Sequence, residues 1–259
     1  MTNAKNIKLE IKDLVIGYGD RIVLQDLNFH VRSGEIFCIM GGSGCGKSTL
    51  LKHIIGLFRP QSGDILISGQ SIVNATAEER RLIMRHFGVT YQGGALFGSM
   101  TVAENIALPL REYTDKSRQE IEEIVNEKLE LVDLAGFGNF MPSELSGGMC
   151  KRAGLARALA LNPDLLFFDE PSAGLDPITS AGLDRLILSL REQFNTTIVV
   201  VTHELDSVFA IADRVIMLDK VSKTIVADGS PADLRAHSEN AWVREFLSRD
   251  GLKRNAGEQ

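Results

Sequence analysis

Three groups of residues in this chain have the types and spacing that phosphate chemistry requires. The first is the run Gly41-Gly42-Ser43-Gly44-Cys45-Gly46-Lys47-Ser48, followed by Thr49, which fits the phosphate-loop pattern G-x-x-x-x-G-K-[ST]. Its glycines allow backbone N–H groups to curl around phosphate oxygens, Lys47 can neutralise the β- and γ-oxygens, and the Ser48 hydroxyl can bind Mg²⁺. Because the run lies between a strand pattern and a helix pattern, it predicts an ATP site rather than a plain glycine-rich turn.

The second group is a pair of carboxylates that follows an apolar run. Leu165–Phe168 has the pattern of a buried strand, and Asp169 and Glu170 come directly after it. Such a pair is by itself more often only the end of a strand, but its meaning changes in a chain that also has a phosphate loop. We then expect Asp169 to hold the magnesium, directly or through water, and Glu170 to be the base that orients and polarises the attacking water.

The third group is Leu145-Ser146-Gly147-Gly148-Met149, which has the features of half a phosphate site. Gly147 and Gly148 leave backbone N–H groups accessible, and Ser146 adds a hydroxyl donor. The helical pattern that follows directs its positive end at the same point. The motif therefore predicts a contact with a nucleotide phosphate.

These groups need strands and helices that place them. Ile7–Ile11 alternates apolar and polar residues, and Ile22–Leu24 and Leu27–Val31 continue a short antiparallel region. The almost wholly apolar Glu35–Met40 reads as a strand buried on both faces, and Ser48–Leu57 reads as the helix after the phosphate loop. The later predicted elements are strand Val89–Tyr91, strand Leu165–Asp169, helix Thr179–Phe194, strand Thr197–Thr202, helix Leu205–Ala212 and strand Val215–Leu218.

Alternation of strands and helices predicts an α/β fold with a mostly parallel sheet. From about residue 97 to residue 161 the pattern is helical alone, so we expect a helical subdomain inserted into the α/β core. The predicted organisation is a single domain over residues 1–250. Within it, 1–96 and 162–250 form the catalytic core lobe and 97–161 form the helical subdomain. A polar tail follows at 251–259.

Composition excludes several classes of protein. The net charge of −6 argues against a nucleic-acid partner, and the three cysteines have no spacing that suggests disulfides or a zinc site. No apolar run approaches the ~20 residues that cross a bilayer, and the N-terminal segment lacks the apolar core of a secretion signal. We therefore expect a cytoplasmic location, with membrane contact only through partners. Because the predicted α/β core extends to about residue 250, we also expect no regulatory C-terminal domain.

The order of the motifs resembles that of ATP-binding subunits of ABC transporters, which have the phosphate-loop ATPase fold. This resemblance gives four single residues a role. Tyr18 resembles the aromatic side chain that stacks on adenine, although a core tyrosine is an alternative. Gln92 resembles the glutamine that touches magnesium and the membrane partner, and His203 the histidine that contacts the γ-phosphate. Asp176 resembles the residue of the loop that crosses between subunits.

The same resemblance implies a homodimer that closes on two ATP molecules, each with Mg²⁺. Each site would take Lys47 and Glu170 from one chain and Ser146, with the rest of its motif, from the other. The motion would be transmitted through the region of Gln92 to membrane-spanning permease subunits.

Two segments narrow the resemblance within the family. Gln92–Phe97 and Pro142–Met149 are similar to the ATPases of Mla (MCE-type) phospholipid transport systems, and Ala107–Glu112 agrees. Met149 stands where importers of small solutes usually have glutamine, and it replaces a polar side chain with a flexible apolar one. This resemblance implies an MlaE-like permease, an MCE-domain lipid-binding protein and a small STAS-domain protein as partners. It places the chain on the cytoplasmic face of a bacterial inner membrane.

Other functions remain open at this point. An importer ATPase for amino acids or another small solute would use the same chemistry with a different permease. A soluble ABC protein of iron–sulfur assembly is a smaller alternative. DNA-repair ABC proteins have a long coiled coil between the two motifs, and ribosomal ABC factors have two ATPase cassettes on one chain. This sequence has neither feature. A scaffold that binds ATP without cleaving it disagrees with Glu170 and His203.

Cys45 suggests a further hypothesis. A thiol inside a phosphate loop, beside backbone donors and a lysine, is expected to have thiolate character. Thiol-specific alkylation would then inhibit the ATPase, and ATP would protect against it. The alternative is that Cys45 is only a small residue that the loop tolerates.

Overall fold

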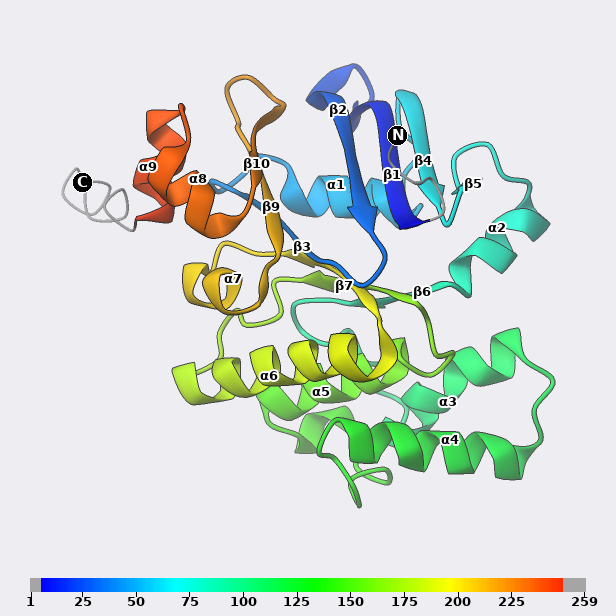
Figure 1. The fold of residues 1–259 in the computed structure, drawn as a ribbon. Coiled ribbons are helices and arrows are strands. Elements are labelled where there is room, and N and C mark those ends of the chain that lie inside the picture. Colours follow the sequence, from blue (N-terminus) through cyan, green and yellow to red (C-terminus); the bar gives the residue numbers. More distant parts are fainter. Residues whose placement is uncertain (1–5, 249–259) are drawn as a thin grey trace. The chain divides into compact units, whose positions relative to one another are not determined.

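The computed structural model describes residues 6–248, which fall into two compact units (Figure 1). The first unit contains residues 6–74 and 199–248, and the second contains residues 75–198. The predicted polar tail lies outside the described residues. Among the helices of residues 6–248, none combines the length and the apolar character that a membrane span requires.

An antiparallel sheet opens the first unit. Strand β1 (Ile7–Tyr18) pairs with β2 (Arg21–Arg32) on one side and with β4 (Ser62–Ile67) on the other, and β5 (Gln70–Ser71) extends β4. The predicted antiparallel region is confirmed, but its strands are longer than the sequence pattern indicated. The two segments expected after residue 21 are one strand, β2, because bulges absorb the breaks in its alternation.

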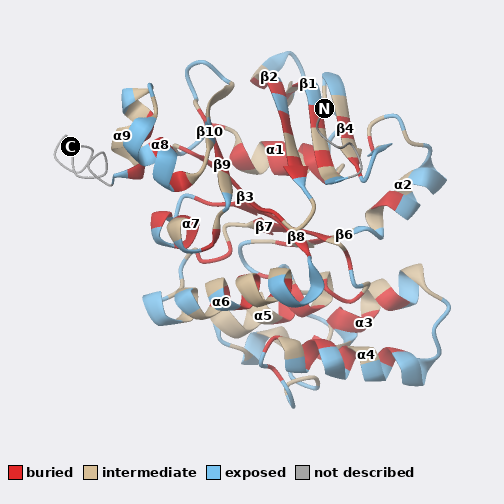
Figure 2. Ribbon diagram, in the orientation of Figure 1, coloured by how far each residue is buried: buried red, intermediate tan, exposed pale blue. Residues whose placement is uncertain are grey.

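The strand that leads to the phosphate loop is β3 (Ile36–Gly41), which pairs in parallel with β9 (Arg214–Leu218). β3 is buried along its whole length (Figure 2), as its unbroken apolar sequence predicted. β9 then pairs antiparallel with β10 (Ile225–Gly229). The parallel register sets Gly41 beside Leu218, so the loops that follow β3 and β9 start side by side.

The helices of the first unit are α1 (Lys47–Ile54), α7 (Leu205–Ile211), α8 (Pro231–His237) and α9 (Ala241–Leu247). α1 is shorter than the predicted Ser48–Leu57, because Ile55 ends it and Gly56 adopts a left-handed φ of 76°. The sequence pattern did not predict α8, α9 or β10. Each of them is short, so its periodic signal is weak.

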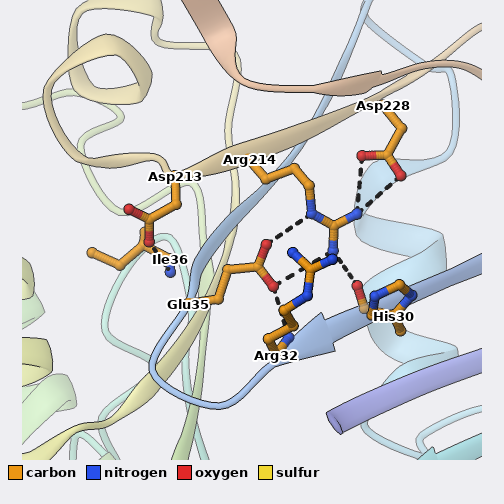
Figure 3. A network of polar contacts seen from close by, with 7 residues as sticks. All are labelled: His30, Arg32, Glu35, Ile36, Asp213, Arg214 and Asp228. Atoms are coloured by element: carbon orange, nitrogen blue, oxygen red, sulfur yellow. Dashed lines mark hydrogen bonds and ion pairs between the residues drawn. The ribbon is translucent and has the colours of Figure 1, made fainter. Parts of the chain in front are cut away.

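A partly buried ionic network connects distant parts of the first unit (Figure 3). Arg214 of β9 donates to Glu35 at 2.7 Å, to both carboxylate oxygens of Asp228 at 2.9 Å, and to the backbone oxygen of His30. Its guanidinium also lies 4.6 Å from the ring centre of Phe37. One planar side chain therefore connects three strands: β2 near its end, β3 at its start, and β10. The several N–H donors of a guanidinium allow one arginine to make all of these bonds.

The second unit is mainly helical. It contains α2 (Ala77–Met84), α3 (Val102–Tyr113), α4 (Arg118–Leu131), the 3₁₀ helix η2 (Pro142–Glu144), α5 (Gly147–Ala158) and α6 (Pro177–Phe194). Its strands β6 (Phe87–Thr90) and β7 (Leu165–Asp169) pair in parallel. β7 has the bounds that the sequence predicted, and α2 was not predicted. Strand β8 (Thr197–Val201) carries the chain from the second unit back into the first.

Side-chain caps fix where the helices of the second unit begin. Thr76, Thr101 and Ser117 each accept a hydrogen bond from the backbone N–H three residues later, and a glutamate at that position bonds back to the cap. Such capping boxes satisfy the first N–H groups of a helix. The parallel strands and their connecting helices confirm the predicted α/β class.

Candidate nucleotide-binding site

The phosphate loop runs from the end of β3 to the start of α1, as predicted. Gly41 has a φ of 149°, and a Cβ atom there would lie 2.4 Å from the backbone oxygen of Leu218. Only glycine allows this approach, which keeps the start of the loop against β9. Gly46, the N-cap residue of α1, has a left-handed φ of 108°.

The N-terminus of α1 has donors that fit a phosphate. In the described part of the chain, no side chain forms a capping hydrogen bond to the first turn of α1, and this turn has no acidic residue. Lys47 is 9% exposed, and its Nζ donates to the backbone oxygens of Gly41 at 2.8 Å and Gly42 at 3.3 Å. Uncapped N–H groups, the helix dipole and a lysine folded back over the loop form a site for an anion, so the residues fit the phosphates of ATP.

Tyr18 lies beside this helix and is not a core residue. Its side chain is 48% exposed, and its hydroxyl lies 3.3 Å from the hydroxyl of Thr49. The ring of Phe58 meets the Tyr18 ring edge-on, with 5.7 Å between centroids. An aromatic side chain that is accessible and held at its edge can stack on a nucleobase.

The expectation about Cys45 is wrong. The side chain is 3% exposed, and burial raises the pKa of the Cys45 thiol, which outweighs the opposing charge of Lys47. The nearby carboxylate of Asp219 acts in the same direction as burial. Cys45 is therefore a neutral packing residue, and alkylation would require the loop to open first.

His203 follows β8 on the first unit. Its ring Nε2 lies 3.6 Å from a carboxylate oxygen of Glu204, and the imidazole is 55% exposed. The backbone N–H of Glu204 donates to the Thr202 hydroxyl, which shapes the turn after the strand. The imidazole is thus presented at the surface where the strand ends, as a contact with a phosphate oxygen requires.

In the second unit Asp169 is the last residue of β7, and Glu170 follows it directly. Glu170 has a left-handed φ of 49°, an uncommon conformation for a residue with a side chain. Lys151 of α5 holds the next turn, because its Nζ donates to the backbone oxygens of Pro171 at 2.8 Å and Ala173 at 2.5 Å. Burial lowers the pKa of Lys151, and the carboxylate of Glu170 opposes this shift.

Ser146 and Asp176 are both helix caps in this structure. The Ser146 hydroxyl accepts from the Met149 N–H at 3.3 Å and leaves its own hydrogen available to donate. Asp176 caps α6 by accepting from the backbone N–H groups of Ile178 and Thr179. The hydroxyl of Thr179 also donates to it, and this bond, with those from the backbone, lowers the pKa of the Asp176 carboxyl. Ser146 is exposed at the start of α5, so the motif presents a helix N-terminus to an outside ligand.

Gln92 lies in a tight turn after β6. The Gly94 N–H donates to the Tyr91 backbone oxygen at 2.8 Å, which closes the turn, and Gln92 and Gly93 project from it as exposed residues. Sequence reasoning missed Lys151, Arg157 and Asn105, whose side chains hold the loops around the site. Their pairing with backbone oxygens leaves no motif that could have revealed them.

The two units divide the predicted residues between them. The first unit contains Tyr18, the phosphate loop through Thr49, and His203. The second unit contains Gln92, Asp169, Glu170, Ser146–Met149 and Asp176. The roles of these residues remain predictions.

The phosphate loop between β3 and α1 and the two carboxylates at the end of β7 define the class of protein, a phosphate-loop ATPase. A model of the ABC transporter family matches residues 24–173, which are more than half of the chain. The chain belongs to the ABC transporter family, as an ATP-hydrolysing subunit.

Curated relatives support this membership over most of the chain. The probable ribonucleotide transport ATP-binding protein mkl of Mycobacterium leprae is 43% identical over 242 residues, covering 93% of this chain and 69% of that protein. The intermembrane phospholipid transport system ATP-binding protein MlaF of Escherichia coli K12 is 42% identical over 244 residues, covering 94% and 89%.

Solved structures agree with the fold. A dimeric structure of the ATP-binding cassette MJ0796, in a post-hydrolysis state bound to ADP and Pi, superposes with a TM-score of 0.78. It is 31% identical and covers 86% of this chain and 98% of that one. The CbiO1 subunit of the Clostridium perfringens transporter complex cbiONQ gives a TM-score of 0.81 at 26% identity, covering 96% and 99%.

Proposed function

We propose that this chain is the ATPase subunit of an inner-membrane transporter that moves phospholipid between the inner and outer membranes. One observation carries the proposal: the similarity to MlaF extends over 94% of this chain and 89% of that protein. Met149 and the segment Gln92–Phe97, which resemble the same systems, also support it.

The roles that we propose for the residues follow from the sequence motifs to which they belong. Backbone N–H groups of 41–49 and the ammonium of Lys47 hold the phosphates, and Tyr18 stacks on adenine. Ser48, Gln92 and Asp169 hold Mg²⁺, whose charge offsets the negative charge of the phosphate oxygens. Glu170 takes the proton of the attacking water, and His203 contacts the γ-phosphate. Ser146–Met149 and Asp176 complete the site of a second copy.

The assembly we infer is a homodimer bound to permease subunits on the cytoplasmic face of a bacterial inner membrane. An MCE-domain lipid-binding protein and a small STAS-domain protein belong to the proposed complex. We also propose that residues 97–161, which bear the Ser146 motif, move as a helical subdomain against the core lobe.

Transport of a ribonucleotide or another small solute is the second candidate. The similarity to mkl favours it, at 43% identity, although this chain covers only 69% of that protein. The two candidates share the ATP chemistry and differ in the membrane partner, so the partner decides between them.

Affinity purification of the tagged chain from membranes, followed by mass spectrometry, tests the proposal. Recovery of a permease with an MCE-domain protein supports phospholipid transport. Recovery with a periplasmic solute-binding protein would contradict it. Phe97→Asp is expected to reduce recovery of the permease, since Phe97 is 51% exposed beside the Gln92 turn. Phe194→Asp, at a 55% exposed residue at the end of α6, is the matched control.

A further inference from the structure

The Gln92 turn is held against α5 by direct backbone contact. A Cβ atom on Gly94 would lie 2.5 Å from the backbone oxygen of Cys150, and Gly94 has a left-handed φ of 77°. A Cβ atom on Gly154 would lie 2.7 Å from the backbone oxygen of Gly94. The two glycines therefore let the turn and the helix touch with no side chain between them.

Arg157, which lies three residues after Gly154 in α5, also binds the Gln92 turn. Its guanidinium donates to the backbone oxygens of Ala95 at 2.8 Å and Gly94 at 3.2 Å. The group also lies over the Phe97 ring, 5.9 Å from its centroid. Gly94 is buried while Gln92 and Gly93 are exposed, so Arg157 holds the fixed end of a turn whose other end is accessible.

The turn also starts close to Asp169. β6 pairs in parallel with β7 in a register that sets Thr90 beside Phe168. The Gln92 turn therefore leaves β6 at the same edge of the sheet at which Asp169 ends β7. Since Arg157 holds the Gly94 end of this turn, its position affects where Gln92 lies relative to Asp169.

We propose that Arg157 is a positioning residue for Gln92. Together with the Gly94–Gly154 contact, Arg157 makes the Gln92 turn move as one body with α5, the helix that Ser146 caps. Displacement of the Ser146 motif along or about the axis of α5 then displaces Gln92. The proposal rests on the proposed function, because it takes Gln92 as a ligand of the magnesium that accompanies ATP.

Arg157→Lys keeps the charge and removes the planar fork, so it tests the geometry directly. We expect the Mg²⁺ concentration for half-maximal ATPase activity to rise about ten-fold, as for loss of a group that supports a metal ligand. The dissociation constant of ATP without Mg²⁺ is expected to stay within about two-fold, because the phosphate loop is unchanged. Arg152→Lys is the matched control, since Arg152 lies on the same helix and binds Val132 and Asp133.

Two further measurements separate positioning from loss of the fold. In protein without nucleotide or metal, amide hydrogen exchange of residues 91–97 is expected to speed up in Arg157→Lys and not in Arg152→Lys. Gly154→Ala leaves Arg157 intact but places a methyl group against Gly94, and should give the same increase. Gly182→Ala in α6 is its control, because the nearest atom there is the mobile end of Arg152 at 3.4 Å.

A double-mutant cycle with Gln92→Ala completes the test. If Arg157 acts through Gln92, the double variant Gln92→Ala/Arg157→Lys is expected to require no more Mg²⁺ than Gln92→Ala alone. Additive losses, or unchanged exchange of residues 91–97 in Arg157→Lys, would overturn the inference. A normal Mg²⁺ requirement in Gln92→Ala itself would instead remove Gln92 from the proposed site.

Discussion

Glu170 combines a proposed catalytic role with a constrained backbone. Its φ of 49° is costly for a residue with a side chain, and such conformations persist where the surroundings enforce them. Lys151 supplies part of that enforcement through Pro171 and Ala173. The carboxylate is thus placed by the turn that follows it, not by β7 alone.

Replacement of this carboxylate should separate ATP binding from hydrolysis. Glu170→Gln keeps the shape of the side chain and removes its basicity, so we expect turnover to fall by about 10²- to 10⁴-fold. ATP binding and ATP-dependent dimerisation should persist, measured by equilibrium titration and light scattering. Glu204→Gln, at the exposed carboxylate beside His203, is the control. Near-normal turnover in Glu170→Gln would exclude Glu170 as the base.

The contact between Tyr18 and Phe58 leads to a prediction about how the nucleobase of ATP is bound. Phe58→Leu removes the ring that meets Tyr18 edge-on, an interaction of about 0.5–1.5 kcal/mol, so ATP affinity should fall about two- to ten-fold. Affinity for inorganic triphosphate should not change, because it has no base. Leu57→Ala, at the neighbouring residue that is 55% exposed, is the control. Equal losses for ATP and triphosphate would show that Phe58 acts on the phosphate loop instead.

At the scale of elements, the loop between β6 and α3 depends on Asn105. This side chain is completely buried, accepts from the Phe97 N–H at 2.8 Å, and donates to the backbone oxygens of Phe97, Met100 and Thr101. One amide therefore fixes a loop that would otherwise expose several unpaired carbonyl groups. The Gln92 turn and the start of α3 are held at either end of this loop.

Asn105→Asp is expected to destabilise the protein strongly. The variant replaces two donors with a buried carboxylate that faces three carbonyl oxygens, so the free energy of unfolding should fall by about 3 kcal/mol. Urea denaturation monitored by circular dichroism measures the change. Asn126→Asp, at an exposed position of α4, should change the free energy of unfolding little. A similar stability in both variants would mean that the Asn105 bonds contribute little.

At the scale of the whole molecule, local periodicity predicted some elements and missed others for physical reasons. The apolar run of β7 and the alternation of β1 are signals within a few residues, so both were predicted. The Arg214 network joins residues up to 184 positions apart, and the contact of Gly94 with Gly154 joins two unremarkable glycines. Cys45 was predicted to be a thiolate from its neighbours, but its pKa is set by burial, which local sequence does not show.

If Ser146 completes the ATP site of a second copy, two inactive variants should restore activity when they form a mixed dimer. Lys47→Ala removes the phosphate contact of a chain's own site, and Ser146→Arg blocks the contact that the chain gives to its partner. Each variant alone should be inactive. In a mixed dimer one site has both defects and the other has neither. An equimolar mixture should therefore recover about a quarter of wild-type ATPase activity, since half of the dimers are mixed and each has one intact site.

A second mixture distinguishes this arrangement from a general effect of mixing. Lys47→Ala and Glu170→Gln both damage the chain's own site, so every site in their mixed dimer carries a defect and activity should stay absent. ATPase activity after co-refolding or subunit exchange measures both mixtures. Recovery of activity in both mixtures, or in neither, would contradict the shared site. A site built from Lys47 of one chain and Ser146 of the other predicts activity in the first mixture and none in the second.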